Sequence, residues 1–128
     1  MATMSLTAGN LGQYEGYRIN QEGQPAIYLV LDGKRHHIPN PTTYNNLCGN
    51  SDTRHAVLDV NIVPDGGALS DGAILARPNN APNVYLVSNG KKRHVTSPAA
   101  MAKFGFDGVI RVVDHVLLDF IPTGGPIS

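Results

Sequence analysis

Two short basic segments bring cationic side chains together with histidine, and they recur at a fixed spacing. They cover residues 34–38 and 91–95, which lie 57 positions apart in the chain. Because successive side chains of a strand alternate between its faces, a strand would present the second and fourth residues of each segment on one face. These residues are Arg35 and His37 in the first segment and Lys92 and His94 in the second. A cation beside an imidazole could hold a phosphate, a sulfate, a carboxylate or a sugar hydroxyl.

A tyrosine precedes each basic segment at the same spacing. Tyr28 lies seven positions before Arg35, and Tyr85 lies seven positions before Lys92. The face of such a ring could stack on a sugar or a base while its hydroxyl makes a hydrogen bond. The chain has no tryptophan, the commonest platform for sugar stacking. The structural alternatives are a half-buried strand tyrosine and an edge strand whose cations discourage aggregation.

Each tyrosine and its basic segment are predicted to form one β-hairpin. The apolar runs at residues 27–30 and 84–87 are typical of strands, and each leads into a turn dipeptide. The dipeptides are Asp32-Gly33 and Asn89-Gly90, whose residue types tolerate the positive φ angles of a two-residue hairpin turn. The tyrosine is therefore expected on the first arm and the basic segment on the second.

The hairpins belong to an internal repeat whose copies cover approximately residues 15–67 and 71–125. Residues 15–19 align with residues 71–75 after a one-residue slip. Beyond the hairpins the offset grows by three, which would match His55, Leu58 and Asp59 with His115, Leu118 and Asp119. Each copy closes on a proline and a glycine pair, at residues 64–67 and 122–125.

Short helices are predicted after each hairpin. In Asn40-Pro41 and Ser97-Pro98 a capping side chain precedes a proline suited to the first helical position. Residues 109–113 are predicted to form a strand, and Asp114 to cap a further helical turn. The expected fold is α+β, mainly β with short helices: one domain over residues 1–128, with two tandem hairpin-plus-helix repeats in a pseudo-two-fold arrangement. The hairpins are expected to share a sheet with the helices outside it.

The second copy carries a recognisable order of short motifs. Residues 71–125 contain Val-Tyr-Leu-Val, Asn-Gly-Lys-Lys-Arg-His, Ser-Pro, Gly-Phe and a closing Ile-Pro-x-Gly. This pattern resembles a short repeat found in tandem in bacterial proteins, many of them surface-associated. The resemblance implies a modular architecture and carries no established activity. The first copy departs from the pattern at Cys48 and Asn50-Ser51, where an aromatic residue is expected, which predicts a poorly packed helix end.

Other reactive residues form no persuasive catalytic set. Neighbours on a strand point to opposite faces, so His36 and His37 cannot easily chelate one ion, although four histidines could meet at a pseudo-symmetric centre. These are His37, His55, His94 and His115. Asp59 and Asp119 are better explained as turn or cap residues than as a glycosidase pair. Ser97 and Cys48 lack the partners of a nucleophile. No catalytic residue, metal site or cofactor is predicted.

The composition restricts the classes of molecule that this chain is expected to bind. Lysine plus arginine equals aspartate plus glutamate at 10 each, so no global field favours nucleic acid or an anionic membrane. No apolar run approaches the length of a membrane span, and the first ten residues lack the features of a leader. With a single cysteine, the chain is expected to be cytoplasmic or leaderless, and whether it is exported is left open.

The function predicted from the sequence is a non-enzymatic, lectin-like binding module with two related sites for a glycan or another small polar ligand. The ligand-binding residues are Tyr28, Arg35 and His37 in the first copy and Tyr85, Lys92 and His94 in the second. Two alternatives remain open, a self-associating structural repeat that forms a homo-oligomer, and a metal-dependent hydrolase that uses the recurrent histidines and aspartates.

Overall fold

The computed structural model describes residues 13–48 and 54–128. Two expectations concern residues outside these ranges. They are the lack of a leader in the first ten residues and the departure from the repeat pattern at Asn50-Ser51.

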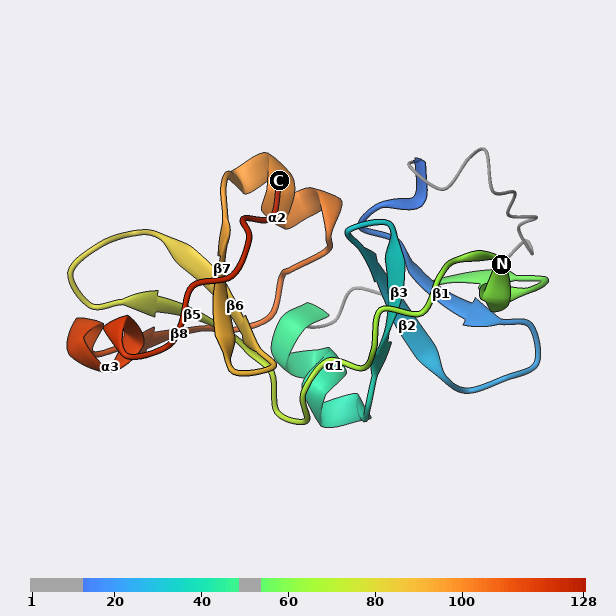
Figure 1. Ribbon diagram of the computed structural model, residues 1–128, viewed down its shortest axis with the longest axis horizontal. Helices are drawn as coiled ribbons and strands as arrows, with labels where there is room; N and C mark the ends of the chain where they lie inside the picture. Colours follow the sequence, from blue (N-terminus) through green and yellow to red (C-terminus); the bar gives the residue numbers. More distant parts are fainter. Residues whose placement is uncertain (1–12, 49–53) are drawn as a thin grey trace.

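The two copies contain the same order of elements (Figure 1). The first copy has strands β1 (Arg18–Gln21), β2 (Ile27–Leu31), β3 (Lys34–Ile38) and β4 (Arg54–Val57), with helix α1 (Pro41–Cys48) before β4 and the 3₁₀ helix η2 (Val60–Ile62) after it. The second copy has strands β5 (Ile74–Pro78), β6 (Val84–Ser88), β7 (Lys91–Val95) and β8 (Ile110–Val113), with helices α2 (Pro98–Lys103) and α3 (His115–Asp119) at the equivalent places. The α+β class and the repeat are therefore confirmed.

Each copy builds a four-stranded sheet of its own, in the orders β3-β2-β1-β4 and β7-β6-β5-β8. The expected common sheet is therefore wrong. The reason is that each copy fills its own sheet edges. The fourth strand pairs in parallel with the first, and the closing segments 64–69 and 122–127 bond along the basic strands. For example, Arg35 N–H donates to Pro64 and Lys92 N–H donates to Pro122, each at 2.8 Å.

Both hairpin turns have the predicted conformation. Asp32 and Gly33 have φ angles of 58° and 70°, and Asn89 and Gly90 have φ angles of 56° and 73°. Positive φ at both central residues matches the right-handed twist of the two arms. The register places Tyr28 directly opposite His37, and Tyr85 directly opposite His94.

The helix starts also follow the sequence. The Asn40 side chain accepts a hydrogen bond from Thr43 N–H at 2.8 Å, and the Ser97 hydroxyl accepts one from Ala100 N–H at 3.1 Å. Asp114 caps α3 by accepting from Val116 N–H at 2.9 Å. These local bonds satisfy amide groups that have no partner inside the helix.

The main hydrophobic core lies between the two sheets and contains residues of both copies. Leu29, Leu31 and Ile38 of the first hairpin join one buried cluster with Leu75 and Leu86 of the second sheet. Leu47 and Cys48 of α1 belong to the same cluster, and α1 runs between the two halves of the molecule (Figure 1). The expectation that the helices lie outside a sheet is therefore wrong for α1. So is the prediction of a poorly packed helix end at Cys48, which is 1% exposed.

The register corrects the alignment of the two copies at both ends. Arg18 lies opposite Leu29 and Leu75 lies opposite Leu86, so Arg18 and Leu75 are equivalent and the slip does not extend into the strand. In the parallel pairs, His55 lies beside Ile19 as Arg111 lies beside Ala76. His55 is thus equivalent to Arg111 and not to His115, which begins α3.

No helix within residues 13–48 and 54–128 has the length and apolar character needed to cross a membrane.

Candidate functional site

The structure brings together a tyrosine and a histidine in each hairpin. The rings of Tyr28 and His37 have centroids 5.5 Å apart at an angle of 50°, and those of Tyr85 and His94 are 5.4 Å apart at 43°. All four side chains are half-buried. Their hydroxyls and ring nitrogens make no hydrogen bond within the described part of the chain. The same pair, with free polar atoms, therefore occurs twice.

The cations predicted to share these sites bind the protein itself. Arg35 donates from Nη1 to the main-chain oxygens of Val60, the first residue of η2, and of Val63, its C-cap. Lys92 donates from Nζ to the main-chain oxygens of Leu118 and Ile121 at the end of α3, at 2.9 and 3.0 Å. Because the last carbonyls of a helix have no partner inside it, a cation there stabilises the helix end. Arg35 also lies 5.7 Å from the centroid of the Tyr28 ring.

Two further basic side chains of the hairpins, His36 and Arg93, make contacts on the opposite face. His36 is within 3.1 Å of the Gly67 carbonyl, and Arg93 donates from Nε to the Gly125 carbonyl at 2.7 Å. Arg93 also forms an ion pair of 2.8 Å with Asp32, which lies in the turn of the first hairpin. These bonds hold the closing segments against their sheets and connect the two hairpins.

The four histidines that could have met at a pseudo-symmetric centre lie in separate surroundings. His37 and His94 each lie beside a tyrosine, His55 stacks on Tyr17, and His115 lies within 3.1 Å of Asn79. Across residues 13–48 and 54–128, no group of three or more His, Cys, Asp or Glu residues could hold a metal ion. Asp59 caps η2 by accepting from Asn61 N–H at 2.9 Å, as predicted for a cap residue, whereas Asp119 ends α3.

The thiol of Cys48 is buried at the end of α1. Burial raises the pKa of this thiol, and the positive charge of Arg18 opposes the shift in part. A raised pKa and a buried sulfur agree with the view that Cys48 is not a nucleophile.

Sequence reasoning missed the role of Arg18. Its side chain is 2% exposed, and Nη1 donates to the main-chain oxygens of Phe104 and Gly105 at 3.2 and 3.3 Å. These acceptors follow α2 in the other copy, so Arg18 joins the two copies. The available signal was that Arg18 stands where the second copy has the apolar Leu75, although the correct alignment is given only by the strand register.

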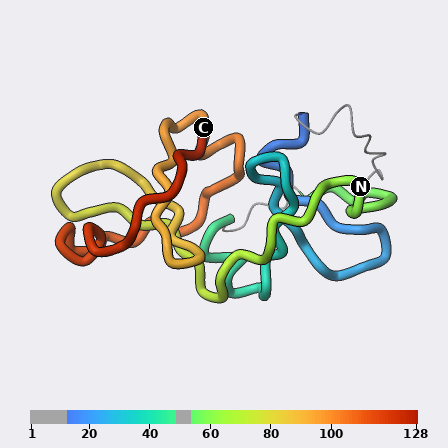
Figure 2. Tube along the Cα trace, viewed as in Figure 1, coloured from blue at the N-terminus to red at the C-terminus, as the bar shows by residue number. Residues whose placement is uncertain are grey.

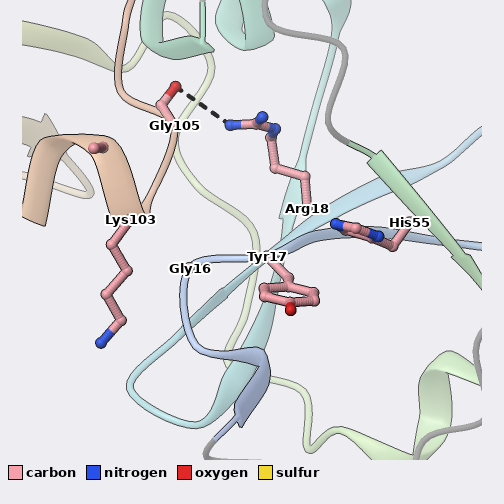
Figure 3. Close-up of a pocket in the computed structure, with 7 residues that line it drawn as sticks. Gly16, Tyr17, Arg18, His55, Lys103 and Gly105 are labelled. Atoms are coloured by element: carbon pink, nitrogen blue, oxygen red, sulfur yellow. Dashed lines mark hydrogen bonds between the residues drawn. The ribbon is translucent and has the colours of Figure 1, made fainter.

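Arg18 also lies at one side of a cleft between the copies (Figure 3). The cleft has a volume of about 220 Å³ and is lined by Gly16, Tyr17, Arg18 and His55 from the first copy and by Ala102, Lys103 and Gly105 from the second. The rings of Tyr17 and His55 are stacked, with centroids 4.6 Å apart and an angle of 25°. Figure 2 shows that the segment after α2 lies on the side of the second copy that faces the first copy.

No protein-family model matches this chain, and neither the curated proteins nor the solved structures contain a match to it. The resemblance of residues 71–125 to a bacterial tandem repeat therefore stays a prediction.

Proposed function

We propose that this protein is a non-enzymatic binding module that holds a carbohydrate at two related sites, one in each copy. The observation that carries the proposal is the repeated pair, Tyr28 with His37 and Tyr85 with His94, in nearly the same geometry. A phenol can donate and accept, an imidazole nitrogen can do either, and a ring face can cover an apolar sugar face. These are the groups that sugar hydroxyls and sugar rings require.

The bonds made by the cations narrow the class of ligand. Arg35 and Lys92 already donate to helix carbonyls, so a ligand at the pairs does not meet an uncommitted charge. This favours a neutral sugar over a sulfate or a phosphate at these two places. The cations then serve to anchor the strands that carry the tyrosines.

Two sites on one rigid unit suit a polymer with repeated sugars. Binding at one site raises the effective concentration of the chain at the other, so weak single sites can give useful avidity. The common core between the two sheets fixes the spacing of the sites.

The test is a glycan array followed by calorimetry with the best oligosaccharide. The double variant Tyr28→Phe/Tyr85→Phe removes both hydroxyls and keeps both rings, and we expect it to weaken binding about fivefold at each site, because one lost hydrogen bond contributes about 1 kcal/mol. Each single variant should retain one site. The matched control is Tyr44→Phe on α1, outside the pairs, which should bind as the parent does.

An array without any signal above background, together with calorimetry that detects no sugar binding, would remove the proposal. Equal losses in the double variant and in Tyr44→Phe would also contradict the assignment of the sites.

A second candidate function is self-association through the outer end of the second copy. Six large apolar side chains on or beside β8 and α3 are between 38% and 81% exposed. They are Val109, Ile110, Val112, Val116, Leu117 and Phe120. In the described part of the first copy only Leu58 and Ile62 are comparable. The strand β8 is also the edge of its sheet, and an open apolar edge favours pairing with another strand.

We propose a second copy of this chain as the occupant of this surface. Typical side-chain areas put its exposed apolar area on the order of 600 Å², close to the ~800 Å² that each partner of a standard interface buries. The partner surface would then be the same one, as in a two-fold dimer.

Analytical ultracentrifugation over a concentration series tests this. We expect a dimer that Leu117→Ser/Phe120→Ser converts to a monomer, because these two side chains lie outside the core. The control Leu58→Ser changes an equally exposed leucine of the first copy and should leave the dimer intact. A parent protein that stays monomeric at all concentrations would contradict self-association.

A further inference from the structure

We infer that the cleft between the two copies is a binding site for a small anion, such as the phosphate or carboxylate group of a small molecule. This site is separate from the Tyr–His pairs and does not depend on them. It exists only where the segment after α2 meets β1, so both copies supply its walls (Figure 3).

The first argument is charge. Arg18, His55 and Lys103 line the cleft, and no carboxylate is among the lining residues that the structure describes. The carboxylate of Glu15, next to the lining residue Gly16, accepts from Asp32 N–H and Gly33 N–H at 2.7 and 2.9 Å. It is therefore bound to the turn of the first hairpin. The cleft is locally basic on a chain whose lysine and arginine residues are balanced by its acidic ones.

The second argument is that two of the basic groups are held in place. Arg18 is buried and bonded to Phe104 and Gly105, so its charge is fixed at one side of the cleft. The imidazole of His55 is fixed by its stacking on Tyr17. A preorganised donor loses little conformational entropy when a ligand binds. Lys103 is exposed, and its Nζ donates to the Ser128 main-chain oxygen at 3.4 Å and lies 5.6 Å from the centroid of the Phe104 ring. Its flexible stem would let the ammonium leave these contacts and turn to a ligand in the cleft.

The third argument is close approach of the main chain. A side-chain carbon at Gly16 would lie 2.5 Å from the Lys103 carbonyl oxygen, and Gly16 has a φ of +89°. A side-chain carbon at Gly105 would lie 1.9 Å from the Arg18 guanidinium. Both positions therefore require glycine. Because glycine has no side chain, the main chains of the two cleft walls can approach each other without filling the cleft.

The size of the cleft limits the ligand. About 220 Å³ is below the range of roughly 300–1,000 Å³ that is usual for drug-sized ligands, so the cleft suits an anionic group with a few attached atoms. The flat stacked pair of Tyr17 and His55 offers contact to a small apolar part next to the anion. A phosphate monoester and a short carboxylate share the chemistry that these walls recognise.

The experiment is a titration of the full chain, uniformly labelled with nitrogen-15, with inorganic phosphate and with acetate, followed by NMR. We expect saturable shifts of the Gly16 and Gly105 amide signals, and glucose at the same concentration should not produce them. The glucose titration separates this site from the proposed carbohydrate sites, because a sugar that shifts only the hairpin signals leaves the two proposals distinguishable.

Two matched variants decide whether the cleft is responsible. Lys103→Glu reverses a charge in the cleft wall, and we expect the dissociation constant for phosphate to rise about tenfold or more. Lys91→Glu makes the same change at an exposed lysine that does not line the cleft, and should change it less than about twofold, because exposed charges are screened by salt. His55→Gln, which keeps a polar side chain without the imidazole ring, should have an intermediate effect.

Shifts that never saturate would overturn the proposal. So would shifts that saturate but lie outside the cleft, or equal weakening by Lys103→Glu and Lys91→Glu, since the anion would then respond only to overall charge. If phosphate binds and acetate does not, the site is retained and its ligand is a phosphate group.

Discussion

The first strands of the two copies carry different residues at the same position. Arg18 in β1 and Leu75 in β5 occupy equivalent places in the pairing with the next strand, and both are buried. Leu75 packs in the core, whereas Arg18 reaches the carbonyls of Phe104 and Gly105 in the other copy. Recurring residues build each unit and share the core between the sheets, and Arg18 shows that a residue that does not recur can add a further joint between the units.

The largest loss of stability is expected at Gly105, where the main chain of the second copy packs most tightly against Arg18 of the first. Gly105→Ala would place a side-chain carbon against the Arg18 guanidinium, at a φ of +63° that alanine disfavours. We expect a loss of about 3 kcal/mol in the free energy of unfolding, of which the backbone conformation contributes about 1. Urea denaturation followed by circular dichroism measures this loss.

The control for that variant is Gly72→Ala. Gly72 also has a positive φ, of +79°, but no atom of the described residues lies within 4 Å of the position that its side-chain carbon would take. The Gly72→Ala variant should lose only the contribution of the backbone conformation, about 1 kcal/mol of its free energy of unfolding. Similar losses for the two variants would show that the contact with Arg18 does not stabilise the fold.

A smaller effect is expected when the first copy is made to resemble the second. Arg18→Leu removes the buried side-chain donor of the Phe104 carbonyl and one of the two donors of the Gly105 carbonyl, and we expect a loss of about 2 kcal/mol in the free energy of unfolding. Arg18→Met restores most of the length of the side chain and should lose a similar amount. If Arg18→Met unfolds at the same urea concentration as the parent, Arg18 acts by filling space.

The comparison of the two copies can also be tested at positions where both copies make the same contact. Arg35→Met and Lys92→Met each remove a cation from helix carbonyls, and we expect both to lose about 1 kcal/mol, because the contacts are equivalent. Lys91→Met, at the exposed neighbouring position, should change stability by less than about 0.5 kcal/mol. A loss confined to one copy in thermal or urea unfolding would show that the repeated contacts differ in strength.

The smallest effect concerns pH. Burial raises the pKa of the Cys48 thiol, so the unfolded chain releases this proton at a lower pH than the folded chain does. Stability should therefore fall as pH rises above the ordinary thiol pKa. Cys48→Ala removes this one contribution, and its unfolding free energy should decline less steeply over the alkaline range in parallel urea titrations. Identical slopes would mean that the thiol does not ionise differently in the two states.

Much of each copy could be predicted because it depends on neighbours in the sequence. Asp32-Gly33 and Asn89-Gly90 form the turns, and Asn40 and Ser97 cap the helices, through contacts that span a few residues. The Tyr–His pairs follow from the same logic, since a two-residue turn fixes which residues of the two arms lie opposite each other.

The hydrogen-bond acceptors of Arg35 and Lys92 could not be predicted in the same way. Lys92 meets the end of α3 through acceptors 26 and 29 residues away, and Arg35 meets the first residue and the C-cap of η2 through acceptors 25 and 28 residues away. Whether a strand cation faces solvent or a helix end depends on which element covers that face. A pattern of alternating residues does not contain this information.

The amino-acid sequence by itself determined the duplication, the hairpins and the helix caps, because short-range sterics and hydrogen bonds within each copy decide them. Only the tertiary structure decided that each copy closes its own sheet, that α1 lies between the sheets and that Arg18 binds a segment 86 residues away. Such choices depend on which surfaces bury the most apolar area together while leaving no carbonyl without a donor, and that balance exists only when the whole chain is folded.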